Sequence, residues 1–201
     1  MLDSKEEIER ALRALSDRLD ATHSPATELA VCGGAALHVR GLMTRGVTRD
    51  VDAFAQLKTE GGVRKLVKAD PLPDFLIREA AIVARDFGIA PDWLNAGPSS
   101  LIDLGLPPGI EARLHAVVYG ARLTVHYIDR WDQVHFKLYA AANYGDPGSR
   151  HVSDLLALNP KAEELESAAR WSLTQDPSPG FRIYLKGCLE HIGHDDVARR
   201  I

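Results

Sequence analysis

The chain of 201 residues carries 24 Lys and Arg against 28 Asp and Glu, a formal net charge of −4 at pH 7. This acidic balance argues against broad, charge-driven binding to nucleic acid and leaves room only for a local basic pocket. Hydrophobic residues make up 45% of the chain, and no apolar run approaches the roughly 18 residues that a membrane span needs.

The first half of the chain alternates helical and strand patterns. Apolar residues at spacings of four, three and four predict an amphipathic N-terminal helix, and Ser4 with Glu7 is typical of a capping box. In chain order the patterns predict a helix over 4–20, a strand over 28–32, a helix over 35–42, a strand over 48–54, and helices over 60–69 and 74–87.

The second half is mostly helical. Proline and glycine punctuate residues 97–109, which predicts an irregular segment. Asp129 is a good N-cap for the helix that follows the last predicted strand. In chain order the patterns predict a strand over 122–128, then helices over 130–143, 150–158, 160–175 and 180–198.

These elements predict an α/β or α+β fold: a sheet with flanking helices, followed by a helical C-terminal region. We expect residues 1–128 to form the α/β core with its N-terminal helix, and residues 129–201 to form a helical region packed on it. Two cysteines make no disulfide framework. The acidic, polar N-terminus is unlike a secretory signal, so we expect a cytoplasmic protein without a membrane partner.

Two aspartates, Asp50 and Asp52, follow shortly after the pair Gly33-Gly34. Residues two apart on a strand point to one face, so both carboxylates can aim at a single hard cation such as Mg²⁺. A strand that ends in glycines before a helix offers backbone N–H groups to phosphate, and glycine permits a close approach. Together these features predict nucleotide and metal chemistry.

An ordered set of motifs resembles the nucleotidyltransferase superfamily with the DNA polymerase β-like core. The nearest resemblance is to bacterial AbiEii-type toxins of toxin–antitoxin pairs and to their uncharacterised relatives, over residues 28–158. Many relatives also carry a segment like residues 91–95, Pro-Asp-Trp-Leu-Asn. The motifs here are Gly33-Gly34, Thr48-Arg49-Asp50-Val51-Asp52, Lys137-Leu138-Tyr139-Ala140 and Arg150-His151-Val152-Ser153-Asp154.

The resemblance implies a polymerase β-like sheet that binds Mg²⁺ and a nucleoside triphosphate. Asp50 and Asp52 would hold the metal, and the backbone at Gly33 and Gly34 would contact the triphosphate. Lys137 would supply a positive charge for phosphate. Asp154 would act as a base toward an incoming hydroxyl, or would orient Lys137.

Two further residues are candidate nucleotide contacts. Thr48 shares the face of the two aspartates and can bond a carboxylate or a phosphate. Arg49 belongs to a cluster with Arg40 and Arg45 that either faces phosphate or is simply solvated.

Plainer interpretations stay open for three residues. Lys137 can be a surface lysine whose stem covers apolar neighbours. Asp154 lies four residues after Arg150, so a salt bridge within one helix explains it equally well. Asn95 is expected to cap or close a loop.

One departure from the family pattern bears on activity. Many polymerase β-like enzymes have a third carboxylate in mid-strand, whereas the strand over 122–128 has none and Asp129 follows only at its end. Either a later aspartate substitutes, or the site holds one well-bound metal, or catalysis has been lost.

The function expected from these features is Mg²⁺-dependent transfer of a nucleoside monophosphate from a nucleoside triphosphate to a hydroxyl. The resemblance implies an RNA 3′ end, such as that of tRNA, or a protein side chain as acceptor; an aminoglycoside-type small molecule is a further option. It also implies a toxin with a cognate antitoxin as partner. The alternative is a catalytically inactive binding scaffold with the same fold.

Overall fold

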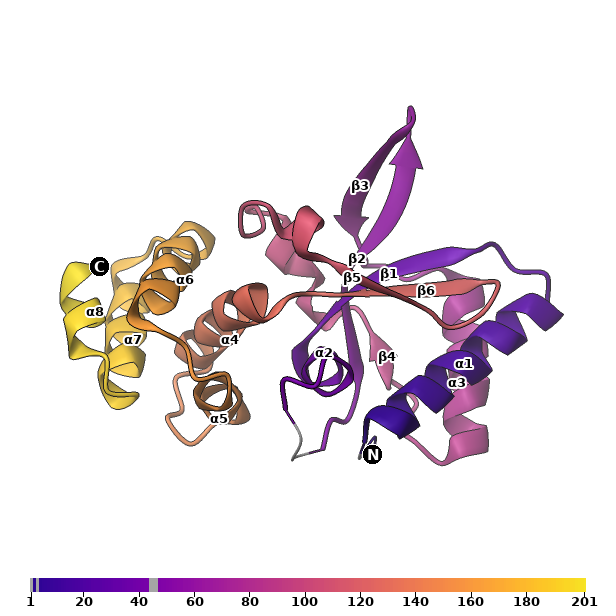
Figure 1. Ribbon diagram of the computed structural model, residues 1–201, viewed down its shortest axis with the longest axis horizontal. Helices are drawn as coiled ribbons and strands as arrows, with labels where there is room; N and C mark the ends of the chain where they lie inside the picture. The colour runs from indigo at the N-terminus through magenta and orange to yellow at the C-terminus, as the bar shows by residue number, and fades with distance from the viewer. Residues whose placement is uncertain (1, 3, 44–46) are drawn as a thin grey trace. The chain divides into compact units, whose positions relative to one another are not determined.

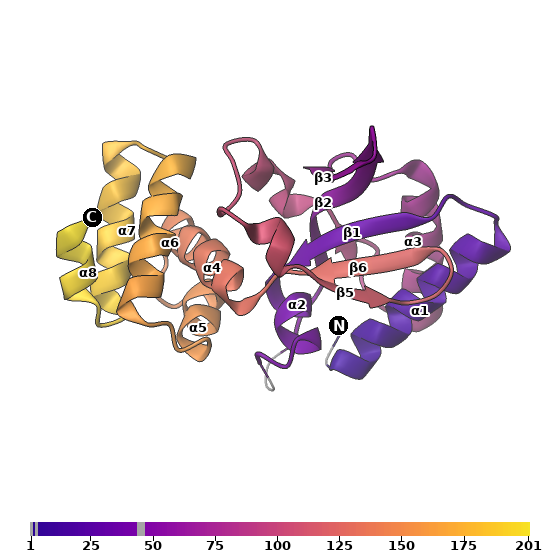
Figure 2. The ribbon, with the colours of Figure 1, turned by 45° about the horizontal axis from the view of Figure 1, so that its top comes forward.

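A computed structural model describes residues 2, 4–43 and 47–201, and the chain in it divides into two compact units. The first comprises residues 1–103 and 109–128, apart from the undescribed positions, and holds the sheet. The second comprises residues 104–108 and 129–201 and is helical (Figures 1 and 2). The predicted division into two domains at residue 128 stays a prediction.

The described part of the first unit contains one six-stranded mixed sheet with the order β3-β2-β1-β6-β5, in which β4 pairs with β2. β1 runs parallel to β6 and antiparallel to β2, while β4 runs parallel to β2. The predicted fold class, an α/β sheet with flanking helices and a helical C-terminal region, is confirmed. The strands are β1 (Thr27–Cys32), β2 (Val51–Glu60), β3 (Val63–Lys68), β4 (Leu94–Asn95), β5 (His115–Val118) and β6 (Leu123–Tyr127).

Two helices, α1 (Lys5–Ala21) and α3 (Asp74–Phe87), pack against each other and against one face of the sheet (Figure 2). The apolar positions of α1 are buried because their helical spacing gathers them into one stripe. Ser4 caps α1 as predicted, since its side chain accepts a hydrogen bond from the Glu7 backbone N–H at 3.2 Å. The short helix α2 (Gly33–Val39) directly follows β1.

The prediction of a helix over 60–69 is wrong, because this segment forms the second half of a hairpin. β2 continues to Glu60, turns at Gly61 and Gly62, and pairs antiparallel with β3 (Figure 1). Both glycines have positive φ, 58° and 81°, a conformation that other residues rarely adopt. The three-residue spacing of Val63 and Leu66 mimicked a helical pattern.

The predicted irregular segment over 97–109 contains the 3-10 helix η1 (Gly97–Ile102), and a second, η2 (Ile110–Arg113), follows it. The short strands β4 and β5 were not predicted from the sequence pattern. Among the described residues, none of the helices combines the length and apolar composition that a bilayer crossing requires.

The second unit is built around α4, which contacts α5, α6 and α7. Asp129 caps α4 as predicted, its side chain accepting from the Trp131 backbone N–H at 3.0 Å. The single helix predicted over 180–198 is two helices, because the chain breaks at Gly193 with φ 84°. The helices are α4 (Arg130–Tyr144), α5 (Arg150–Ala157), α6 (Ala162–Gln175), α7 (Pro179–His191) and α8 (Asp195–Arg200).

Candidate active site

The turn from β1 into α2 carries the two glycines on which the sequence argument rests. Gly33 has φ 70°, which only glycine adopts without strain, and both glycines are half-buried. Cys32, the last residue of β1, pairs directly with Asp52 of β2. The sheet register therefore brings the second aspartate beside the glycine turn.

The absent side chains of these glycines make room for other side chains of the same unit. A Cβ atom on Gly33 would lie 2.5 Å from Oδ2 of Asp52, and one on Gly34 would lie 2.6 Å from Oγ1 of Thr48. Both distances are shorter than real Cβ contacts, so neither position accepts a larger residue without movement. Asp52 and Thr48 therefore give a structural reason for glycine at these two positions, and the expected approach of phosphate to this turn stays a prediction.

Asp50 lies between the two residues that contact the glycines. The predicted strand over 48–54 begins only at Val51, so Asp50 precedes β2 while Asp52 lies in it. The Thr48 hydroxyl donates to the backbone carbonyl of Asp50 at 3.0 Å, which shapes this approach to the strand. Because Thr48 and Asp52 both touch the glycine turn, Asp50 is held beside the same turn.

The side chain of Asp50 has an unusual environment. Its Oδ1 atom is buried and has no hydrogen-bond partner. A carboxylate oxygen withdrawn from water without a partner is costly, and a bound cation is the simplest group that satisfies it. In their chemistry, the carboxylates of Asp50 and Asp52 are the oxygen ligands that a hard divalent cation takes.

Within the segment 91–95, Trp93, Leu94 and Asn95 contact the start of β2. Asn95 of β4 pairs with Asp52, and its Nδ2 donates to Oδ1 of that carboxylate at 3.2 Å. The Val51 backbone N–H donates to the carbonyl of Trp93. The Trp93 indole is fully buried and donates to the carbonyl of Ala80 in α3 at 2.9 Å. Asn95 closes a loop as expected, since its Oδ1 accepts from the Gly97 backbone N–H at 2.8 Å, and it also contacts Asp52.

The Arg49 side chain forms an ion pair with Asp92 of the same chain. Its Nη2 donates to both carboxylate oxygens of Asp92, at 3.1 and 3.0 Å, and both side chains are exposed. This hydrogen bond lowers the pKa of Asp92 below its usual range. Of the other two arginines in the predicted cluster, Arg40 is half-buried and Arg45 lies outside the described residues.

The third carboxylate remains missing from the described part of the chain. No group of three or more His, Cys, Asp or Glu side chains there is arranged to hold a metal ion. The later aspartate, Asp129, is engaged as the cap of α4. On the last strand, β6, Leu123, Val125 and Tyr127 belong to the core cluster of buried residues, so Thr124 and His126 occupy the other face.

Lys137 and Asp154 come together in the second unit, on α4 and α5. Lys137 Nζ lies 2.5 Å from Asp154 Oδ2, and their side chains are only 7% and 14% exposed. The interpretation of Lys137 as an exposed surface lysine is therefore wrong. Among the described residues, Asp154 forms an ion pair with Lys137 and not with Arg150 of its own helix.

His151 lies close to this buried ion pair. Burial, and then the charges of Lys137 and Arg150, lower the pKa of His151 to about 4. Its Nδ1 atom is buried without a hydrogen-bond partner. The imidazole is therefore neutral at pH 7.

A second polar cluster on the sheet was not anticipated. The Glu28 carboxylate of β1 pairs with Arg64 of β3 and with His126 Nε2 of β6, the latter at 2.7 Å. Burial lowers the pKa of His126 despite this carboxylate. The pair Gly61-Gly62, which is typical of a hairpin turn, was the signal that would have placed Arg64 on a strand.

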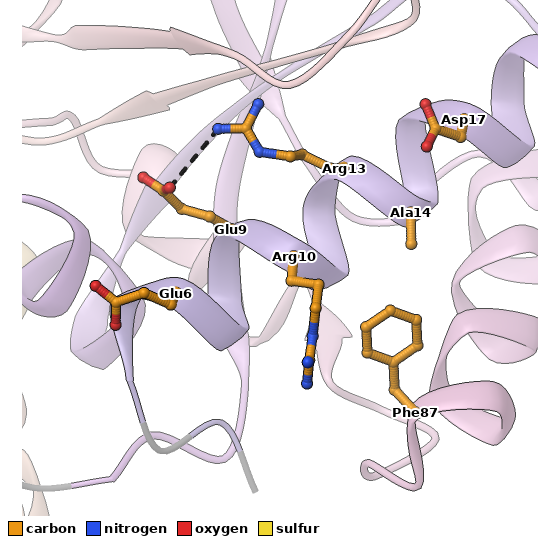
Figure 3. A pocket seen from close by; sticks show the side chains of 7 residues that line it. All are labelled: Glu6, Glu9, Arg10, Arg13, Ala14, Asp17 and Phe87. Carbon is orange, nitrogen blue, oxygen red and sulfur yellow. Dashed lines mark ion pairs between the residues drawn. The ribbon is translucent and has the colours of Figure 1, made fainter.

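A hollow on the first unit lies away from the predicted residues. It is formed by one side of α1 and the end of α3, where Arg10 stacks over the Phe87 ring at 5.3 Å and Arg13 pairs with Glu9 at 3.7 Å (Figure 3). Its lining contains acidic and basic side chains together with Phe87 and none of the predicted site residues.

Comparison of the chain with protein-family models, with curated proteins and with solved structures finds no match. The argument for function therefore rests on the residues and geometry described above.

Proposed function

We propose that this protein is a Mg²⁺-dependent nucleotidyltransferase of the polymerase β-like superfamily. The observation that carries the proposal is the buried, unpartnered Oδ1 of Asp50. Asp50 lies two residues before Asp52, and Oδ2 of Asp52 lies against the glycine turn at Gly33. Two carboxylates with this disposition are suited to one hard cation.

Asp50 and Asp52 would hold Mg²⁺, which when bound neutralises charge on the triphosphate. The half-buried backbone at Gly33 and Gly34 remains the proposed triphosphate contact, through N–H groups of the first helical turn. Since the Thr48 hydroxyl bonds the Asp50 carbonyl, its proposed role is to shape the metal-binding segment. The proposed nucleotide contact of Arg49 requires it to leave Asp92.

Lys137 and Asp154 are proposed to act as a pair. The short ion pair supports the option in which Asp154 orients the lysine ammonium. A lysine ammonium gives phosphate a point charge. The role of Asp154 as a base toward an incoming hydroxyl stays a proposal beside this one.

The acceptor is proposed to be a hydroxyl on an RNA 3′ end such as that of tRNA, or on a protein side chain. This part rests on the resemblance of the motifs to AbiEii-type toxins, as does the proposal of a cognate antitoxin. The proposed location is the cytoplasm, which is compatible with a reaction that consumes a nucleoside triphosphate.

The experiment measures binding and transfer separately. Isothermal titration with each nucleoside triphosphate, with and without Mg²⁺, tests binding; Asp50→Asn and Asp52→Asn are expected to abolish the metal-dependent part. Asp86→Asn, at an exposed salt-bridged aspartate of α3, is the matched control. Labelled triphosphates incubated with total tRNA, and then with a proteome extract, identify the acceptor.

A second candidate is a binding scaffold that has lost catalysis. The absence of a three-carboxylate group among the described residues favours it. Triphosphate binding that needs neither Asp50 nor Asp52, with no transfer to any acceptor, would select the scaffold.

A further inference from the structure

The helix α7 exposes large apolar side chains on the second unit. Ile183 is 71% exposed and Tyr184 is 62% exposed, although both lie well inside the helix. The opposite side of α7 carries the buried residues Phe181, Leu185 and Leu189, so the helix already packs on its own unit through that side. A second apolar face on one helix is typical of an interaction surface.

A hollow of about 300 Å³ lies along this exposed face. It is bounded by α7 on one side and by the end of α4, the turn after it and α5 on the other. Its lining is mostly apolar and includes the polar groups of Asp146 and His191. Nothing lies within 4 Å of the position that a Cβ atom on Gly187 would take, so the α7 backbone is open to a close approach there. Pockets for small-molecule ligands run from roughly 300 to 1,000 Å³, so this hollow suits one or two side chains better than a large ligand.

The residues along this face are arranged so that the face fits a second copy of itself. Gly180, Tyr184, Gly187 and His191 are exposed and spaced by four, three and four residues, which places them on one side of the helix. If a second α7 packs antiparallel, with the twofold axis between residues 185 and 186, Tyr184 of each copy meets Gly187 of the other. Gly180 then meets His191. A large residue is therefore opposite a small one at each level, as close helix packing requires.

The charges of α7 favour the same arrangement. Arg182 lies in the first half of the helix and Glu190 in the second half, and both are exposed. Antiparallel packing about that axis brings Arg182 of each copy to within about one residue of the level of Glu190 of the other. Parallel packing would instead place like charges side by side. Charge pairs at the rim of an interface select the partner and its orientation.

We propose that the exposed face of α7 is the contact of a homodimer in which two α7 helices pack antiparallel. The Tyr184 side chain of each copy enters the hollow beside Gly187 of the other. Its ring meets the apolar lining, and Asp146 or His191 bonds its hydroxyl. Such a contact uses the same patch on both copies, which is the common geometry of a symmetric dimer. None of the residues of this face belongs to the proposed nucleotide site.

Sedimentation velocity of the full chain over a series of concentrations measures the dissociation constant of the dimer. Tyr184→Ser is expected to raise this constant by about tenfold or more, as the loss of a central aromatic side chain from an interface does. Ile77→Ser, at another exposed apolar position in the helix α3, is the control and should leave the constant unchanged. Circular dichroism and thermal unfolding establish that both variants are folded.

Gly187→Ala separates the interface from the stability of the fold. Alanine favours a helix more than glycine does, so the monomer should become more stable. The added methyl group takes space that Tyr184 of the second copy needs, so the dimer should weaken severalfold. An equal or tighter dimer would contradict the contact between Tyr184 and Gly187.

Charge reversal tests the antiparallel orientation. Arg182→Glu alone, or Glu190→Arg alone, places like charges together in the dimer, so each variant should dimerise more weakly than the native chain. An equal mixture of the two variants should recover dimerisation, because one chain then carries two acidic residues and the other two basic residues at these positions.

Three results would overturn the proposal. A native chain that stays monomeric across the concentration series leaves the α7 face to a different partner. A dimer unaffected by Tyr184→Ser forms through another surface. A dimer weakened by Tyr184→Ser, but not recovered in the mixture of charge variants, does not pack its α7 helices antiparallel.

Discussion

Oδ2 of Asp52 lies 2.5 Å from the point where a Cβ atom on Gly33 would stand. The contact links the end of β1 to the start of β2 and explains why residue 33 lacks a side chain. It also predicts that the glycine and the aspartate cannot be altered independently.

Gly33→Ala is expected to destabilise the protein by about 1–3 kcal/mol, because alanine is strained at positive φ and its methyl group displaces the Asp52 carboxylate. Thermal unfolding measures the loss, and isothermal titration should show weaker metal-dependent nucleotide binding. Gly187→Ala is the control: nothing lies within 4 Å of its Cβ position in α7. There alanine should stabilise by roughly 0.5–1 kcal/mol. Equal stability of the two variants would contradict the steric argument.

Arg49 and Asp92 offer a test of the predicted phosphate contact. Arg49→Gln is expected to weaken nucleotide binding severalfold, whereas Asp92→Asn, which releases Arg49 from its partner, should leave binding unchanged or tighter. Because the pair is exposed and screened by solvent, neither change should measurably alter stability. Isothermal titration and urea unfolding measure the two effects. Arg49 has no nucleotide role if both variants bind like the native protein.

The buried pair of Lys137 and Asp154 should dominate stability in the second unit. Lys137→Met or Asp154→Leu alone is expected to cost about 3–5 kcal/mol, since each leaves an uncompensated charge in the interior. The double variant should recover much of that loss. Lys65→Met, which breaks an exposed pair with Glu60, is the control and should cost at most about 1 kcal/mol. Urea unfolding reports each value; additive losses in the double variant would argue against coupling.

His151 predicts a pH dependence of stability. Its pKa is about 4 in the folded chain, against 6.5 for an ordinary histidine. Between these values the unfolded chain binds a proton that the folded chain excludes, so stability should fall as pH drops from 7 to 4.5. The side chain is partly exposed, so we expect a loss on the order of 1 kcal/mol. His151→Gln should remove this part of the pH dependence in urea unfolding, and an unaltered profile would refute the assignment.

Local patterns in the sequence were sufficient for several elements. The stripe of apolar residues and Ser4 placed α1, and Asp129 placed the start of α4, because caps and helical periodicity depend only on neighbouring residues. The closeness of Asp52 to the glycines also followed from their order along two successive elements.

Other features needed the fold. Residues 63–68 form a strand because β2 supplies its hydrogen-bonding partner, and a partner strand leaves little trace in local spacing. The bond from Asn95 to Asp52 joins residues 43 positions apart, and the pair of Lys137 with Asp154 joins two helices.

The sequence by itself therefore determined which residues are proposed to carry chemistry: two aspartates, two glycines, a lysine and a later aspartate. Only the tertiary structure decided which atoms meet. Oδ2 of Asp52 lies against the glycine turn, and Oδ1 of Asp50 is buried without a hydrogen-bond partner. The physical reason is range. Helical periodicity and caps are interactions between near neighbours, whereas strand pairing and side-chain burial join segments that the chain order leaves far apart.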